Sequence, residues 1–84
     1  NPFNPSTTIR FTVTDNNEEI AKINIFNSLG ELVSVLSVNL HGKGTYETVW
    51  NGTDIKGKSV SSGVYLYSLN LGNKVLVKKM ILSK

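Results

Sequence analysis

Residues 52–59, with the sequence GTDIKGKS, match the phosphate-binding pattern G-x-x-x-x-G-K-[ST]. A loop of this type holds phosphates with backbone N–H groups at the start of a helix that follows directly. The next residues, 60–65, favour β-structure and include Gly63, so a helix is not expected there. The sequence also offers no later strand that ends in a metal-binding Asp. We therefore expect the glycines to form tight turns and expect no nucleotide site.

Asn51, Thr53 and Asp54 place three oxygen-bearing side chains close together, as a calcium site would require. The alternating carboxylates and later Glu of a calcium loop are absent. We expect a turn held by hydrogen bonds from side chain to backbone, and no metal.

His41 is the single histidine of the chain and lies in a predicted loop. A hydrolytic triad needs a histidine beside a nucleophile and an orienting acid, and no serine lies in a Gly-x-Ser-x-Gly elbow. We expect a solvated loop residue, and the sequence predicts no catalytic residue, no cofactor and no enzymatic activity.

Tyr65 and Tyr67 share one face of a predicted strand, and Tyr46 is a candidate neighbour. An aromatic strip of this kind can stack on sugars or nucleobases. Core packing, or a tyrosine corner in which the hydroxyl binds nearby backbone, is the expected role. Sugar stacking stays open as the alternative.

The size and composition of the chain indicate one small domain, with 84 residues and 39% hydrophobic content. No run of eighteen apolar residues is present, so no transmembrane helix is predicted, and no signal-peptide pattern is found. Cysteine is absent, which excludes disulfides and thiolate sites. Because the chain opens with Asn1, we expect a fragment whose parent domain lies upstream.

Positive charge gathers in the second half of the chain. Residues 1–42 hold two cationic and four acidic side chains, a sum of −2, and residues 43–84 hold seven lysines and two acids, a sum of +5. Such a basic end suits an acidic partner or an anionic lipid. It equally suits a solvated strand whose lysines discourage edge pairing.

Alternation of apolar and polar residues predicts strands along most of the chain. The expected strands cover residues 7–13, 21–26, 31–36, 45–51, 64–71 and 74–83, with a short extended piece near Val60. Turn signals separate them at intervals of roughly eight to twelve residues, as in β-sandwiches. We predict an all-β fold, an immunoglobulin-like antiparallel β-sandwich of about seven strands, with residues 1–6 as a linker pinned by Phe3 and residues 7–84 as the domain.

Several positions are expected to organise this sandwich. Trp50 should sit between the sheets as the largest apolar side chain, with Tyr65 in a structural role. Gly30, Gly57 and Gly63 should serve tight turns. Imperfect apolar alternation in residues 64–71 suggests either a bulge or burial on both faces, and the break at residues 78–79 suggests a slip in register.

Taken in order, these segments resemble the C-terminal sorting domains (type A) of the type IX secretion system of Bacteroidota-type bacteria. The resemblance rests on NPFNPSTTI at residues 1–9, INIFNSLG at 23–30, VWNGTD at 49–54, SGVYLY at 62–67 and KKMIL at 78–82. The middle of the chain is also similar to the immunoglobulin-like domain of flagellar hook-capping proteins.

The resemblance to sorting domains implies a seven-stranded sandwich that directs an upstream cargo through an outer-membrane translocon. It implies shuttle and translocon partners, a surface peptidase that cleaves upstream of or near Asn1, and passage through the periplasm to the cell surface or medium. It implies neither nucleic acid binding nor direct membrane insertion. We expect the last strand to carry recognition, through the following residues: Lys74, Val77, Lys78, Lys79, Met80, Ile81, Leu82 and Lys84.

Two other functions stay open at this point. One is an accessory module that binds carbohydrate or packs against a neighbouring enzyme domain. The other is an assembly scaffold like a hook cap, which predicts oligomers.

Overall fold

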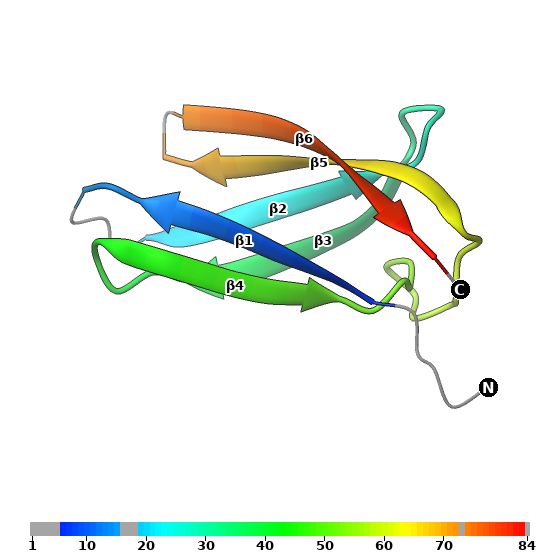
Figure 1. Ribbon diagram of the computed structural model, residues 1–84, viewed down its shortest axis with the longest axis horizontal. Helices are drawn as coiled ribbons and strands as arrows, with labels where there is room; N and C mark the ends of the chain where they lie inside the picture. Colours follow the sequence, from blue (N-terminus) through cyan, green and yellow to red (C-terminus); the bar gives the residue numbers. More distant parts are fainter. Residues whose placement is uncertain (1–5, 16–18, 73, 84) are drawn as a thin grey trace.

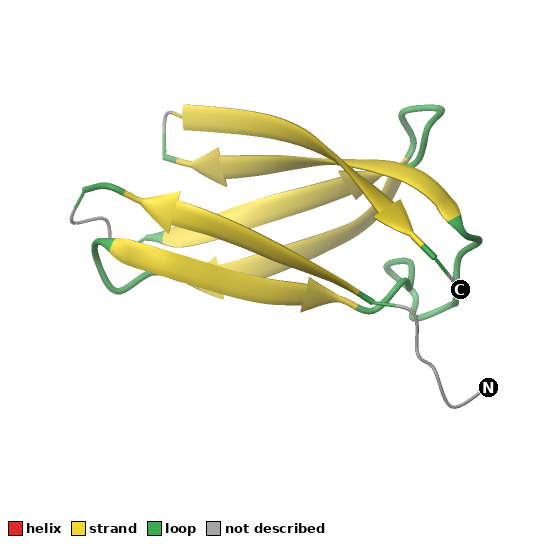
Figure 2. Cartoon of the chain, viewed as in Figure 1, coloured by secondary structure: helices red, strands yellow, loops and turns green. Residues whose placement is uncertain are grey.

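The computed structural model describes residues 6–15, 19–72 and 74–83, and these residues form strands and loops without a helix (Figures 1 and 2). The strands are β1 (Thr7–Val13), β2 (Ile20–Phe26), β3 (Leu32–Asn39), β4 (Gly44–Trp50), β5 (Gly63–Leu71) and β6 (Lys74–Leu82). The described part of the chain therefore has no helix that could span a bilayer. The predicted linker anchor, Phe3, lies outside the described residues, and so does Lys84.

Two antiparallel sheets of unequal width build the sandwich. One has two strands in the order β1-β4, and the other has four in the order β3-β2-β5-β6 (Figure 1). The predicted all-β immunoglobulin-like sandwich is confirmed, with six strands instead of seven. The expected seventh piece near Val60 is reduced to an isolated bridge between Thr53 and Ser59, because successive turns occupy residues 51–62.

The core follows from period-two alternation, because successive side chains of a strand point to opposite faces. In β1 the residues Ile9, Phe11 and Val13 are buried, and the residues between them are exposed. Trp50 is 1% exposed, and its ring meets that of Tyr65 edge-on with centroids 4.9 Å apart. Its indole Nε1–H donates to the carbonyl of Thr53 at 2.9 Å. The predicted central role of Trp50 is confirmed.

The last hairpin keeps an unbroken register, from Gly63 opposite Leu82 to Leu71 opposite Lys74. The bulge that was one alternative for residues 64–71 and the slip predicted at residues 78–79 are therefore wrong. Apolar residues lie on both faces of these strands, so their sequence shows no clear alternation of apolar and polar residues. The register shift that the structure does show lies between Ile25 and Phe26, where β2 pairs with β3.

The turn between β2 and β3 is organised by Asn27. Its Oδ1 accepts the N–H groups of Leu29 at 3.0 Å and Glu31 at 2.9 Å, and its backbone N–H donates to the carbonyl of Glu31. Gly30 has a φ of 83°, a left-handed conformation that favours glycine. The predicted turn role of Gly30 is confirmed.

Candidate functional site

β6 is an edge strand of the four-stranded sheet, hydrogen-bonded to β5 on one side. An edge strand presents main-chain N–H and C=O groups that another chain can pair with. The residues predicted to carry recognition lie on this strand, apart from Lys84. The pleat divides them between two faces with different surroundings.

The outer face of β6 carries large apolar side chains that no part of the described chain covers. Val75 is 59% exposed, and Val77 and Ile81 are each 64% exposed. On the neighbouring strand β5, Val64 is 44% and Leu66 is 36% exposed. Register places Val64 opposite Ile81, so the patch is continuous across both strands. We call these five residues the outer patch; contiguous exposed apolar surface of this kind marks interaction sites.

The inner face of β6 holds the other predicted residues. Met80 is 8% exposed and Leu82 is 1% exposed, and both belong to the core. A partner can reach the side chains of Met80 and Leu82 only if the strand leaves the sheet, whereas Val77, Lys79 and Ile81 are accessible on the outer face of the intact domain. Lys74 and Lys78 face inward, on the same side as Leu76.

The four-stranded sheet is uniformly basic. Its strands β2, β3, β5 and β6 contain no Asp or Glu. They contain four lysines, namely Lys22, Lys74, Lys78 and Lys79. The outer patch therefore surrounds Lys79 without any carboxylate from its own sheet, and its field favours an acidic partner surface.

The segment that resembles a phosphate loop is a side-chain-stabilised turn. Asp54 Oδ1 accepts the backbone N–H groups of Lys56 and Lys58, each at 2.9 Å. Gly57 has a φ of 85°, and β5 follows at Gly63 where a phosphate loop would need a helix. The expectation of a tight turn is confirmed at Gly57, whereas the turn predicted at Gly63 is wrong, because Gly63 is the first residue of β5 and pairs with Leu82.

The oxygens of Asn51, Thr53 and Asp54, which the sequence offers as candidate calcium ligands, also serve this turn. The Thr53 hydroxyl donates to Asn51 Oδ1 at 2.7 Å, and both backbone bonds to Asp54 use its Oδ1. Within residues 6–15, 19–72 and 74–83, no group of three His, Cys, Asp or Glu side chains is placed to hold a metal ion.

Tyr65 forms the expected corner, because its hydroxyl donates to the carbonyl of Ser61 at 2.6 Å. Tyr65 is 5% and Tyr67 is 8% exposed, and burial raises the pKa of the Tyr67 hydroxyl above its ordinary value. A sugar cannot stack on these faces, so the carbohydrate alternative built on this pair is wrong for these residues.

His41 supports a neighbouring aromatic residue through its backbone. Its N–H donates to the Tyr46 hydroxyl at 2.8 Å, and that hydroxyl donates to the carbonyl of Gly42 at 2.7 Å. Tyr46 in turn stacks on Phe11, with ring centroids 5.6 Å apart. The His41 residue is exposed, as expected for a loop histidine.

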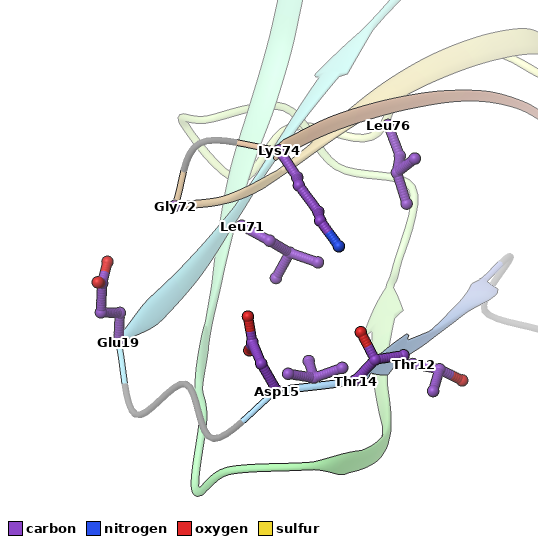
Figure 3. A pocket seen from close by; sticks show the side chains of 9 residues that line it. Thr12, Thr14, Asp15, Glu19, Leu71, Gly72, Lys74 and Leu76 are labelled. Carbon is purple, nitrogen blue, oxygen red and sulfur yellow. The ribbon is translucent and has the colours of Figure 1, made fainter.

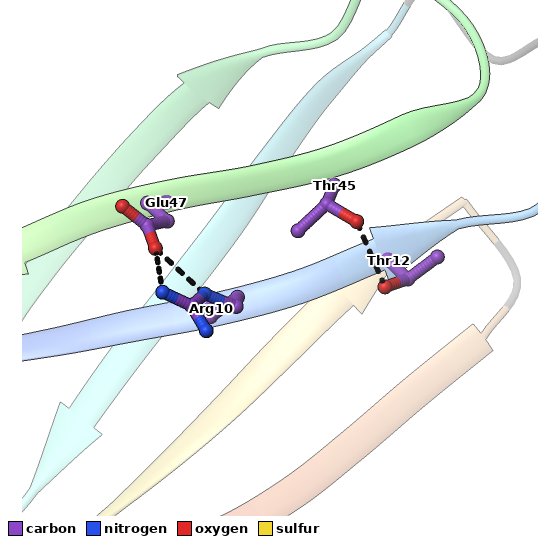
Figure 4. A network of polar contacts seen from close by, with 4 residues as sticks. All are labelled: Arg10, Thr12, Thr45 and Glu47. Atoms are coloured by element: carbon purple, nitrogen blue, oxygen red, sulfur yellow. Dashed lines mark hydrogen bonds and ion pairs between the residues drawn. The ribbon is translucent and has the colours of Figure 1, made fainter.

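The outer face of the small sheet is mostly polar, with Val49 as an exposed apolar side chain. Arg10 and Glu47 lie opposite each other in register and form an ion pair, and Thr12 and Thr45 face each other with hydroxyls 3.4 Å apart (Figure 4). Exposed cross-strand pairs of this kind contribute at most about 1 kcal/mol. This face therefore stabilises the pairing of β1 with β4 and offers no apolar docking surface.

Sequence reasoning missed a groove between β1 and the last hairpin. Two adjoining hollows, of about 470 and 390 Å³, lie along β1 and share Thr12 and Leu76. Figure 3 shows the first of them. The groove exists because the two-stranded sheet does not cover the whole inner face of the four-stranded one (Figure 1). No local sequence pattern signals it, since it depends on the relative widths of the sheets.

Comparison with known proteins gives one family. The family model described as FlgD Ig-like domain matches residues 3–74, which is most of the chain. No curated protein and no solved structure matches.

Proposed function

Given that this chain belongs to the family of FlgD Ig-like domains, a non-catalytic domain type, we propose that it is a sorting domain of the type IX secretion system. In this role it directs an upstream cargo through the outer-membrane translocon for surface display or release. The proposal places the domain in the periplasm during transit and at the surface or in the medium afterwards. A surface peptidase then separates it from the cargo near Asn1.

The observation that carries the proposal is the outer patch on the edge strand β6. Val75, Val77 and Ile81 are each more than half exposed, and they lie on a basic sheet beside Lys79. Exposed apolar surface of this extent marks a place where another protein surface docks. A carrier that must be recognised repeatedly by shuttle and translocon proteins needs an accessible docking surface.

The proposed mechanism is docking without chemistry. The partner adds main-chain hydrogen bonds along the free edge of β6 and covers the outer patch with apolar side chains. Acidic groups on the partner meet Lys79 and guide association, an effect that salt weakens. Affinity then depends on the strand edge and the outer patch, so the same domain can direct cargoes of unrelated sequence.

The test uses a reporter cargo fused to this chain in a bacterium that has the type IX system. Deletion of residues 77–84 would remove the core residues Met80 and Leu82 and unfold the domain, so point changes are more informative. The paired change Val77→Glu and Ile81→Glu charges the outer patch while the core stays intact. We expect surface reporter to fall at least tenfold, with the midpoint of thermal unfolding close to that of the parent.

Val35→Glu is the matched control, because Val35 is 38% exposed on the opposite edge strand of the same sheet. It introduces one carboxylate on the same sheet, as each of the two changes in the paired variant does, and should leave export unchanged. Undiminished export of the paired variant, or an equal loss with Val35→Glu, would refute the proposal.

Packing against a neighbouring enzyme domain is the competing function that the outer patch also favours. In that case the patch is covered by the chain's own upstream domain, and the domain stays attached after export. Limited proteolysis and cross-linking of the full-length parent distinguish the two: a patch protected in the monomeric parent supports the accessory function. Oligomers held together through the patch would instead support an assembly role.

A further inference from the structure

The groove between β1 and β6 lies on the opposite side of the four-stranded sheet from the outer patch. At its narrow end the two strands meet, where the Thr7 hydroxyl donates to the carbonyl of Ile81 at 3.2 Å. From there the strands diverge toward the end of β1 (Figure 1). The result is an open wedge between the edge strands of the two sheets.

One wall of the wedge is an unpaired strand edge. β1 pairs with β4 along its whole length, from Thr7 opposite Trp50 to Val13 opposite Gly44. In an antiparallel ladder, alternate residues direct their N–H and C=O groups away from the partner strand. Those groups of β1 face the wedge, where the two-stranded sheet ends.

The floor of the wedge is apolar. Leu76 lines both hollows, and although it faces inward it is 47% exposed, because no strand of the small sheet lies over it. Leu71 extends this floor along β5 in the first hollow (Figure 3). Tyr67 extends it in the second hollow. A third strand in the small sheet would lie over this half-exposed leucine, Leu76, and cover it.

The charges around the wedge are unequal along its length. The hollow nearer its middle is lined by Lys78 and by Arg10, whose guanidinium is paired with Glu47, and by no acidic residue. The hollow at the wide end is lined by Asp15, Glu19 and Lys74 (Figure 3). A carboxylate is therefore favoured beside Lys78, two positions along the strand from Leu76, and is disfavoured at the wide end.

We propose that this wedge binds an extended peptide segment of a partner protein, which adds to β1 as the third strand of the small sheet. The segment places an apolar side chain over Leu76 and, two residues away on the same face, a carboxylate beside Lys78. The spacing follows from the period of a strand, since residues i and i+2 share a face. Main-chain pairing with β1 supplies affinity, and the pair of side chains supplies selectivity. This site is separate from the outer patch and does not depend on the export function.

The test measures binding of synthetic peptides to the isolated domain by titration calorimetry and by amide chemical shifts. The probe has the sequence Thr-Thr-Val-Thr-Glu-Thr with blocked ends, and a second peptide carries Lys in place of Glu. We expect the Glu peptide to bind roughly tenfold more tightly, because one peptide gains an ion pair and the other meets a like charge. The largest shift changes should fall on β1 and around Leu76.

Lys78→Glu should reverse this preference, so that the Lys peptide binds more tightly. Lys79→Glu is the matched control, because it is the adjacent residue on the opposite face of the same strand. It should leave the preference for the Glu peptide in place. A Glu peptide N-methylated at alternate residues should lose binding, since it cannot pair with β1.

Three results would overturn the proposal. The first is an equal effect of Lys78→Glu and Lys79→Glu, which would mean general attraction to a basic sheet. The second is undiminished binding of the N-methylated peptide. The third is the formation of dimers through β1 that the Lys78→Glu change dissociates. In that case a second copy of this chain would be the occupant of the wedge.

Discussion

Removal of a single oxygen atom from Tyr65 tests the corner that joins β5 to the loop before it. Tyr65→Phe deletes the hydroxyl that donates to the carbonyl of Ser61 at 2.6 Å and leaves the ring against Trp50. A neutral hydrogen bond contributes about 1 kcal/mol net. Ser61 is exposed, so water can satisfy its freed carbonyl and no further penalty is expected. For a domain of this size, a loss of about 1 kcal/mol lowers the unfolding midpoint by roughly 4 to 8 °C.

Tyr67→Phe is the control for this prediction. The same atom is removed from the same face of the same strand, at a residue as well buried as Tyr65. The Tyr67 hydroxyl makes no hydrogen bond to the other described residues. We therefore expect its removal to change the free energy of unfolding by less than about 0.5 kcal/mol.

The assay is urea unfolding followed by the fluorescence of the single tryptophan, which both variants retain. Trp50 is buried in the folded chain and becomes solvated on unfolding, so it reports the global transition. Equal stabilities for the two variants, with unchanged dependence on urea, would show that the Tyr65 hydroxyl bond does not support the fold. The assignment of Tyr65 as a corner would then be wrong.

Two further outcomes follow from contacts in the structure. Burial raises the pKa of Tyr67 above 10.0 in the folded chain, so the folded state holds its proton longer than the unfolded state. Stability should then fall as pH rises from about 10 toward the folded pKa, and less steeply in Tyr67→Phe; identical slopes in urea titrations across this range would contradict the assignment. Asp54→Ala removes the acceptor of the Lys56 and Lys58 N–H groups and should cost about 1 to 2 kcal/mol, whereas Asp54→Asn keeps an oxygen acceptor and should cost less than half of that. Equal losses measured by urea unfolding would mean that the carboxylate acts by charge and not as a hydrogen-bond acceptor.

The strands that bury one face were predictable from sequence, because burial imposes alternation on them. In β1 every second residue from Ile9 to Val13 is apolar and buried, so the sequence shows directly which face of the strand is buried. Turns that require a left-handed backbone conformation were equally predictable, as at Gly30 and Gly57, where φ is positive. The role of Trp50 followed from its size alone.

The last two strands were harder, because apolar residues occupy both of their faces. Val64, Leu66, Val77 and Ile81 resemble core residues in composition, and the structure places all of them on the outside. Because these apolar residues lie next to core residues in the sequence, the alternation looked broken and suggested register slips that do not exist. The same residues form the outer patch, so the place where alternation failed is the surface proposed for docking.

Local chemistry in this chain defined the strands, the turns and the tryptophan at the centre, since each depends on residues near one another in sequence. Which strands pair, and how many lie in each layer, depended on contacts between distant segments. The sheet of two strands facing a sheet of four leaves Leu76 half exposed and one edge of β1 open. Hydrogen bonding along a strand edge is nearly independent of side chains, so an open edge and the groove beside it become visible only when the layers are assembled.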